Sequence, residues 1–342
     1  MNYLKRYGIG DYFNNIITLV PKMLKSCLLP AIIVFLPAGL FYFLGFQAFG
    51  TSIAQLEELL GDPEDLLFPI LKILSGFLWF IPAGIFTAGG HCLLTAMVGK
   101  KTFSIIHGEE APGQPVQAAF KNSFWPLVVQ GIIIGALVGA FMLIIVGIIV
   151  ALLLLVIRPG ADGDSPGTAV MVLTILTMVI MYLAMIPALY WFFVKTIVAP
   201  QAVIRENCGP FQGIKRSFFL TKGNFWRSLG IYLLIGMVIS FAISMVSGPV
   251  IFIMILPGYI DFIKAILSSG DDYSSAQVFT MFQTLAPGIG IAMFMQSVFY
   301  YLIYPVFGSL MYTDLAIRKG EIAEAVPAPA IAGNEGTGLG QP

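Results

Sequence analysis

Few side chains in this sequence could do catalytic chemistry. The two histidines, His91 and His107, each lack a carboxylate or a second histidine at the ligand spacing of a zinc motif such as HExxH. The sequence also contains neither the P-loop of ATP-driven transporters nor the nucleophile motif of serine hydrolases. We therefore expect no catalytic residue, no metal site and no cofactor, which argues against an enzyme.

The segment with the densest positive charge, residues 199–231, indicates binding to anions instead. Within it Phe211, Ile214 and Phe218 recur at helical spacing while the cations take other positions, which is typical of a helix that lies on a membrane. Anionic headgroups attract a nearby cation by about 1 kcal/mol. We expect contacts with anionic lipid headgroups from Lys215, Arg216, Lys222 and Arg227. The alternative is that these cations only set the orientation of the chain in the membrane.

The elements that position these residues are transmembrane helices. Hydrophobic residues make up 58% of the chain and charged residues 11%, against about 45–50% and about 25% in soluble domains. A stretch of about 20 apolar residues is long enough to cross a bilayer as a helix. The sequence therefore predicts an all-α, multi-pass helical bundle with transmembrane helices at about residues 27–49, 68–94, 125–157, 168–194, 225–256 and 285–311.

The segments between the spans predict helices on the membrane surface. Residues 1–26, 102–122 and 199–231 combine apolar residues at helical spacing with Lys and Arg, as cytoplasmic interfacial amphipathic helices do. Together with the six spans they form one membrane domain, residues 1–321. Residues 322–342 are rich in Pro, Ala and Gly and predict a disordered cytoplasmic tail.

The order of these elements repeats about every 100 residues. Ile106-His107-Gly108-Glu109 takes the place of Ile204-Arg205-Glu206-Asn207, and Phe124-Trp125 takes the place of Phe225-Trp226. With the surface helix that precedes the first span, this order predicts three copies of one helix-hairpin unit. Such repeats place a site at their interface in many transporters, but they also arise by duplication of a stable hairpin with no transport role.

The orientation follows from the distribution of cations. All but three of the 18 Lys and Arg residues fall on one side of the predicted spans, which leaves Lys72, Arg158 and Lys264 on the other side. The positive-inside rule places the cation-rich side in the cytoplasm. We therefore expect a prokaryotic cytoplasmic (cell inner) membrane, both termini in the cytoplasm, and outer loops at residues 51–65 and 257–283.

Small residues in the third span indicate a helix-packing face. Gly131, Gly135 and Gly139 form a GxxxGxxxG series, which puts three flat patches on one side of the helix at residues 125–157. Because a glycine face lets another backbone approach closely, we expect these three residues to pack against a neighbouring helix.

Polar residues inside the spans are neutral. Ser240, Ser244 and Ser247 lie on one face of the fifth span, where they either join helices by hydrogen bonds or line a polar path. His91 follows two glycines near the inner end of the second span, and we interpret it as a hydrogen-bonded or interfacial residue. The lack of buried carboxylates argues against a proton- or sodium-coupled pump.

The cation-rich segment and the end of the last span together resemble a known family. Residues 200–231 read PQAVIRENCGPFQGIKRSFFLTKGNFWRSLGI and residues 312–321 read YTDLAIRKGE. They resemble the membrane-domain family that occurs joined to some glycerophosphoryl diester phosphodiesterases and as stand-alone bacterial and archaeal proteins. The matching positions are Arg216, Ser217, Tyr312, Asp314, Arg318 and Glu321, whereas Thr313 and Ala316 depart and the Glu-Gly order is lost. The resemblance implies a six-span membrane domain, without the catalytic barrel of the phosphodiesterase.

Three hypotheses about function follow. The first is a non-catalytic integral membrane scaffold or accessory protein whose partners are anionic membrane lipids and a further membrane protein, with no nucleic acid. The second is a passive or partner-driven carrier of lipid or a small amphipathic solute, favoured by the repeats and the prolines within the spans. The third is an intramembrane enzyme, for which the sequence offers no catalytic group.

Overall fold

The computed structural model describes residues 3–59, 67–109, 120–157, 168–269 and 275–323. Every regular element in these ranges is a helix, which confirms the all-α prediction. The long helices are α1 (Ile9–Leu59), α2 (Leu67–Leu78), α3 (Phe80–His107), α5 (Trp125–Ile157), α6 (Thr168–Thr196), α9 (Phe225–Ser269) and α10 (Ser275–Arg318). The short ones are the π-helical turn η2 (Phe120–Phe124), α7 (Ala199–Glu206) and α8 (Pro210–Thr221).

Six helical stretches of the described chain are long and apolar enough to cross a membrane, as predicted. They are Ile9–Ser52, Leu74–His107, Asn122–Ala151, Val172–Glu206, Phe225–Lys264 and Leu285–Arg318. The predicted bounds of the third span, residues 125–157, are those of α5. Most of the other helices extend well beyond their predicted spans.

The N-terminal surface helix and the first span were predicted as separate elements, but they are one helix. α1 begins at Ile9 and continues through Pro21, Pro30 and Pro37. Proline is tolerated inside membrane helices because neighbouring groups and local adjustments satisfy the freed backbone carbonyls. The outer loop predicted at residues 51–65 is therefore shorter, since α1 ends only at Leu59.

The outer loop predicted at residues 257–283 is also shorter. α9 continues through Pro257 to Ser269, and α10 begins at Ser275. The helix continues because Ile260 and Ile263 carry its apolar spacing onward past the proline. Of the second predicted surface helix, residues 110–119 lie outside the described residues, as does the predicted tail after residue 323.

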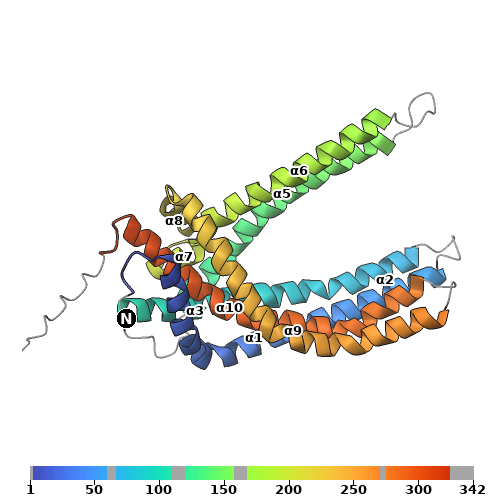
Figure 1. Cartoon of the computed structure of the whole chain (residues 1–342), viewed down its shortest axis with the longest axis horizontal. Coiled ribbons are helices and arrows are strands. Elements are labelled where there is room, and N and C mark those ends of the chain that lie inside the picture. The colour runs from blue at the N-terminus through green and yellow to red at the C-terminus, as the bar shows by residue number, and fades with distance from the viewer. Residues whose placement is uncertain (1–2, 60–66, 110–119, 158–167, 270–274, 324–342) are drawn as a thin grey trace, which may run out of the picture.

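The helices form two arms that diverge from a common base (Figure 1). The main arm contains α1, α2, α9 and α10, with α3 leading from α2 toward the base, and the hairpin arm consists of α5 and α6. The base, which we call the connector end, contains α7, α8, the N-terminal turns of α1 and the C-terminal turns of α10.

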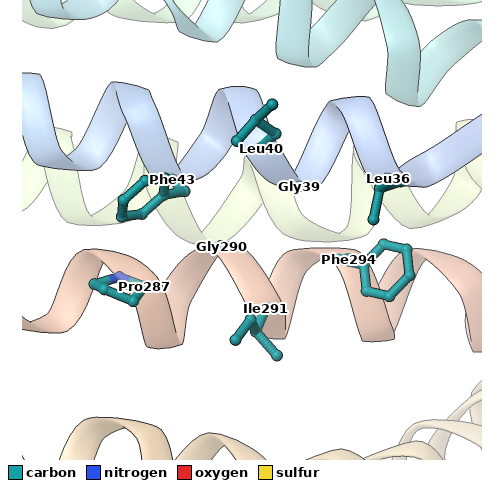
Figure 2. Close-up of a pocket in the computed structure, with 8 residues that line it drawn as sticks. All are labelled: Leu36, Gly39, Leu40, Phe43, Pro287, Gly290, Ile291 and Phe294. Atoms are coloured by element: carbon teal, nitrogen blue, oxygen red, sulfur yellow. The ribbon is translucent and has the colours of Figure 1, made fainter.

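The main arm is held together by a close crossing of α1 and α10, at which Gly39 faces Gly290 (Figure 2). A Cβ atom on Gly39 would lie 2.8 Å from the Cβ of Phe294, and one on Gly290 would lie 2.7 Å from the Cβ of Phe43. Only glycine allows this approach. An apolar pocket of about 430 Å³ opens beside the crossing, and its lining offers almost no polar surface.

Among the residues that the structure describes, the hairpin arm has no comparable neighbour. The most apolar 18-residue windows of α5 and α6 contain no buried residue. Leu143 of α5 is 73% exposed, and Leu173 of α6 is 65% exposed. In a bilayer, lipid or another protein covers these side chains.

Candidate functional site

At the connector end, α7 and α8 pack closely enough to require glycine between them. A Cβ atom on Gly213 of α8 would lie 2.5 Å from Cγ2 of Val203 and 3.0 Å from the carbonyl oxygen of Ala199, both on α7. The buried residues of α8 are Gly213, Ser217, Leu220 and Thr221. Of its aromatic residues, Phe211 and Phe219 are exposed.

Asp314, fully buried on α10, joins three helices at this end. Its carboxylate accepts hydrogen bonds from the Tyr7 backbone N–H at 2.8 Å and from the Tyr12 hydroxyl at 3.0 Å. It also forms ion pairs with Arg227 of α9 at 2.6 Å and with Arg318 at 3.0 Å. Burial, followed by the charge of Asp314, raises the pKa of Tyr7. The expectation that the chain lacks buried carboxylates is therefore wrong at Asp314. All its partners belong to the chain, which makes it an anchor between α1, α9 and α10.

Arg216 of α8 is the centre of a second group of ion pairs. Its Nε donates to Glu206 at 2.6 Å, and its two terminal nitrogens pair with both carboxylate oxygens of Glu321. The Tyr312 hydroxyl also donates to Glu206. The hydrogen bond to Glu321, with a further contribution from Glu206, raises the pKa of Arg216. This group links both connector helices to the end of the last span.

Five of the six positions on which the predicted resemblance rests belong to these two groups. Arg216, Tyr312 and Glu321 form the second group, and Asp314 and Arg318 belong to the first. Ser217 donates to the Lys195 carbonyl at 2.7 Å. The motif therefore fastens the connector helices to α6, α9 and α10, and the two arginines predicted to contact headgroups, Arg216 and Arg227, are engaged by carboxylates of the chain.

The two lysines of the predicted headgroup set differ from the arginines. Lys215 and Lys222 are exposed, and the described part of the chain offers neither of them an ion pair with a carboxylate. Lys195 and Lys319 lie close enough to Lys222 for their charges to interact. Lys319 also donates to the Lys222 carbonyl at 2.9 Å. We call Lys195, Lys222 and Lys319 the lysine cluster.

Sequence reasoning missed two members of the lysine cluster. Lys195 was interpreted as a residue that reaches to the interface from a span end, and Lys319 as part of the closing motif. They are 124 residues apart in number, so only the packing of α6 and α10 against α8 brings them together. No spacing rule for a single helix could have found this.

The three glycines predicted to pack, Gly131, Gly135 and Gly139, face open space within the chain. A Cβ atom on any of them would meet nothing within 4 Å. Their packing role stays a prediction, because no described residue of this chain packs against them.

A polar groove, which we call the tyrosine groove, begins where the two arms meet. Its middle part, about 280 Å³, lies between Tyr190 of α6 and Tyr232 and Ser240 of α9. A second part, about 350 Å³, extends along α9 and α10 past Ser240 and Gln296. Tyr300 lines both parts. Of the predicted serine face, Ser240 and Ser244 line this groove, whereas Ser247 is buried and donates to the Ile243 carbonyl.

The end of the groove nearest the connector helices is a cavity of about 240 Å³, which we call the Gln201 cavity. Gln201 of α7 is 4% exposed, and its Oε1 has no hydrogen-bond partner among the described residues. Gly308 makes room for it, since a Cβ atom there would lie 2.3 Å from the Gln201 amide nitrogen. The other polar residues of the lining are His91, Thr95, Thr196, Tyr232, Tyr300 and Tyr304.

His91 in this cavity is a hydrogen-bonded residue, as its position predicted. Its Nδ1 lies 3.4 Å from the Thr95 hydroxyl, and its ring lies 4.5 Å from that of Tyr301. Gln201 carries no sequence signal, because it is a single amide on a short connector helix. The lining of the cavity and groove contains no charged side chain, so its chemistry is hydrogen bonding and aromatic contact.

Within the described ranges, no three His, Cys, Asp or Glu side chains come together as a metal site would require. No curated protein and no solved structure matches the chain. A family model matches residues 113–312, more than half of the chain, and this match covers the hairpin arm, the connector helices and most of α9 and α10. The chain therefore belongs to the family whose description is Family of unknown function (DUF7544).

Proposed function

We propose that this chain is a non-catalytic membrane scaffold or accessory protein whose connector end faces the cytoplasm and binds anionic lipid headgroups. The observation that carries the proposal is the lysine cluster. Its three ammonium groups have no paired carboxylate among the described residues, and Lys319 donates to the Lys222 carbonyl, while the neighbouring carboxylates Glu206, Glu321 and Asp314 are taken by arginines. An anionic headgroup would supply the countercharge that the described chain does not.

The positions of the connector helices support a location at the membrane surface. α8 buries small and polar residues and exposes Phe211 and Phe219, which would then insert between lipid headgroups. Trp226 at the start of α9 is 80% exposed, and tryptophan is favoured at the boundary between water and lipid. This arrangement agrees with surface helices that lie flat beside the spans.

The proposal also includes the predicted origin of the chain as three copies of one helix-hairpin unit. The ring pairs Phe124–Trp125 and Phe225–Trp226 start α5 and α9 with the same geometry, 5.3 Å between centroids and 74° between planes. α3 and α7, which precede them, both end at a left-handed residue, Gly108 and Asn207. These likenesses support duplication.

The hairpin arm supports the scaffold part of the proposal. α5 and α6 extend away from the rest of the chain (Figure 1), and the glycine face of α5 is open. A transmembrane helix of another protein would find on α5 the flat surface that close packing in a membrane needs.

The test compares lipid retained by two variants of equal charge. We expect the variant Lys195→Gln, Lys222→Gln, Lys319→Gln to keep several-fold less anionic lipid than the parent after purification in mild detergent, measured by mass spectrometry. The control variant Lys5→Gln, Lys22→Gln, Lys25→Gln, whose lysines lie near the N-terminus, should keep most of it. Retention by the parent should fall with salt, because the Debye length shrinks from about 10 Å at 0.1 M to about 3 Å at 1 M.

Orientation is checked in the same variants with single cysteines in a cysteine-free background. Gln212 of α8 and Asp261 of α9 are both exposed, so an impermeant thiol reagent applied to intact cells should label Asp261→Cys and not Gln212→Cys.

Equal lipid loss in the two lysine variants would mean that the cluster supplies charge only for orientation. Unchanged lipid in both variants would contradict the proposal.

The tyrosine groove favours the second function, a carrier of lipid or a small amphipathic solute. Its polar lining runs along the spans rather than across the connector end. A carrier predicts that purified protein in vesicles speeds the transfer of an amphiphile between leaflets, whereas a scaffold leaves that rate unchanged.

A further inference from the structure

The Gln201 cavity contains a buried polar group that nothing in the described chain satisfies. Gln201 is 4% exposed, its Oε1 is without a partner, and its side chain lines the cavity. Leaving a buried acceptor unpaired is unfavourable, so native proteins pair such groups with protein, water or ligand. The cavity volume of about 240 Å³ exceeds the share of one water molecule, about 30 Å³, and so has room for a ligand fragment.

From this geometry we infer that the Gln201 cavity binds the uncharged, hydroxyl-bearing headgroup of an amphiphile whose apolar part lies between the two arms. The inference goes beyond the proposal that the connector end binds anionic lipid. It names a ligand class for the carrier function, but it does not depend on that function. Binding can occur with or without transport.

The lining decides the chemistry of the headgroup. Gln201 Oε1 needs a hydrogen-bond donor, which a hydroxyl supplies and a phosphocholine group does not. A charged ammonium could donate, but no carboxylate lines the cavity to pair with it, and an unpaired buried charge is costly. The hydroxyls of Thr95, Thr196 and the tyrosines can donate to or accept from further hydroxyls of the ligand. A neutral polyol or glycerol group fits these conditions.

The shape of the groove decides where the rest of the ligand lies. The Gln201 cavity and the middle part of the groove share Tyr232, Tyr300 and Tyr304 in their linings. Residues of both α6 and α9 line that middle part, and these two helices diverge from the connector end (Figure 1). Leu233 and Met237 add apolar surface there, and both are exposed. Acyl chains in the bilayer between the arms could therefore stay in lipid while the headgroup reaches Gln201.

The test uses the full chain in nanodiscs of phosphatidylcholine that contain a photoreactive diacylglycerol. We expect crosslinks in the peptides of Tyr232, Tyr300 and Tyr304, competed by unlabelled dioctanoylglycerol. Gln201→Met keeps the length of the side chain and removes the amide, and it should reduce labelling by about fivefold or more. Tyr304→Phe, which removes one hydroxyl, provides a second variant in case the first does not fold.

Thr177→Val is the matched control, because its hydroxyl on α6 is bonded to the Leu173 carbonyl away from the cavity. Labelling of this control should equal that of the parent. The inference is overturned if Gln201→Met and Tyr304→Phe both fold and label like the parent. It is equally overturned if a photoreactive phosphatidylcholine with the same chains labels these peptides as strongly. Loss of labelling with unchanged anionic-lipid retention would separate this site from the lysine cluster.

Discussion

The main arm and the hairpin arm contain the same kind of apolar helix, but their glycines meet different surroundings. In the main arm Gly39 and Gly290 lie face to face, where an added Cβ would clash. In the hairpin arm Gly131, Gly135 and Gly139 have open space around them. α1 crosses α10 closely, whereas α5 lies beside α6 with the glycine face turned outward. A GxxxG spacing therefore indicates a flat face and does not say what covers it.

The two arms also differ in how they are fixed at the connector end. The main arm has the buried Asp314, which joins α1, α9 and α10. The hairpin arm is tied there by hydrogen bonds between uncharged groups: Gln130 of α5 donates to the Pro210 carbonyl at 3.4 Å, and Ser217 donates to the Lys195 carbonyl of α6 at 2.7 Å. We expect the main arm to be the stable part of the chain and the hairpin arm to be the part that adapts to a partner.

The largest effect should come from Asp314→Asn. The substitution keeps the volume but leaves Arg227 and Arg318 without their buried partner, and breaking such a pair costs about 3 kcal/mol. We expect a detergent unfolding temperature several degrees lower. Hydrogen exchange should increase at the start of α1 and of α9 and stay unchanged in α5.

Asp261→Asn is the control for this change. Asp261 is also a carboxylate on a long helix, but its side chain is 69% exposed. Its distance to the Lys264 ammonium, 3.8 Å, is long for an ion pair. We expect no measurable effect. Equal destabilisation by the two substitutions would mean that the Asp314 contacts do not hold the main arm together.

A smaller effect should distinguish the two sets of glycines directly. Gly39→Ala and Gly135→Ala bring the same gain in helix propensity, so their difference measures packing. The Cβ on Gly39 would lie 2.8 Å from the Cβ of Phe294, and overpacking of this kind costs about 2 kcal/mol. We expect Gly39→Ala to unfold at lower temperature than Gly135→Ala.

Gly135→Ala also reports on a partner of the hairpin arm. In purified monomer it should be as stable as the parent, because the added methyl group meets nothing within 4 Å. If it destabilises a purified complex or oligomer but not the monomer, another helix covers this face. If it destabilises the monomer as much as Gly39→Ala does, the comparison between the arms is wrong.

Hydropathy was enough to predict the six spans. In lipid every backbone N–H and C=O group must form a hydrogen bond within the protein, and a single apolar segment achieves this as a helix. It could not predict that α1 continues from Ile9 to Leu59, since prolines and acidic residues that end helices in water are tolerated at a membrane boundary. The bounds of α5 were predicted because tryptophan and a turn-forming Pro/Gly/Asp segment mark its ends.

The candidate sites were harder to predict from the sequence because they depend on contacts between distant segments. Lys222 was identified from local charge, but Lys195 and Lys319 reach it only through tertiary packing. Arg216 and Arg227 carry the same charge as the lysines, and nothing local shows that Glu321 and Asp314 engage them. Gln201 is significant only because Gly308 and the tyrosines surround it.

The smallest effect is expected at the ion pair between Arg205 and Glu109, which joins α7 to the end of α3. The two atoms are 3.0 Å apart, but the Glu109 side chain is 52% exposed, and exposed pairs contribute about 0.2–1 kcal/mol. Glu109→Gln should therefore lower stability by no more than about 0.5 kcal/mol, and Arg205 should remain over the Phe103 ring. Thermal unfolding at low and high salt measures this, since a screened surface pair should matter even less in 1 M salt. A loss comparable to that of Asp314→Asn would show that the connector end depends on its exposed charges as much as on its buried one.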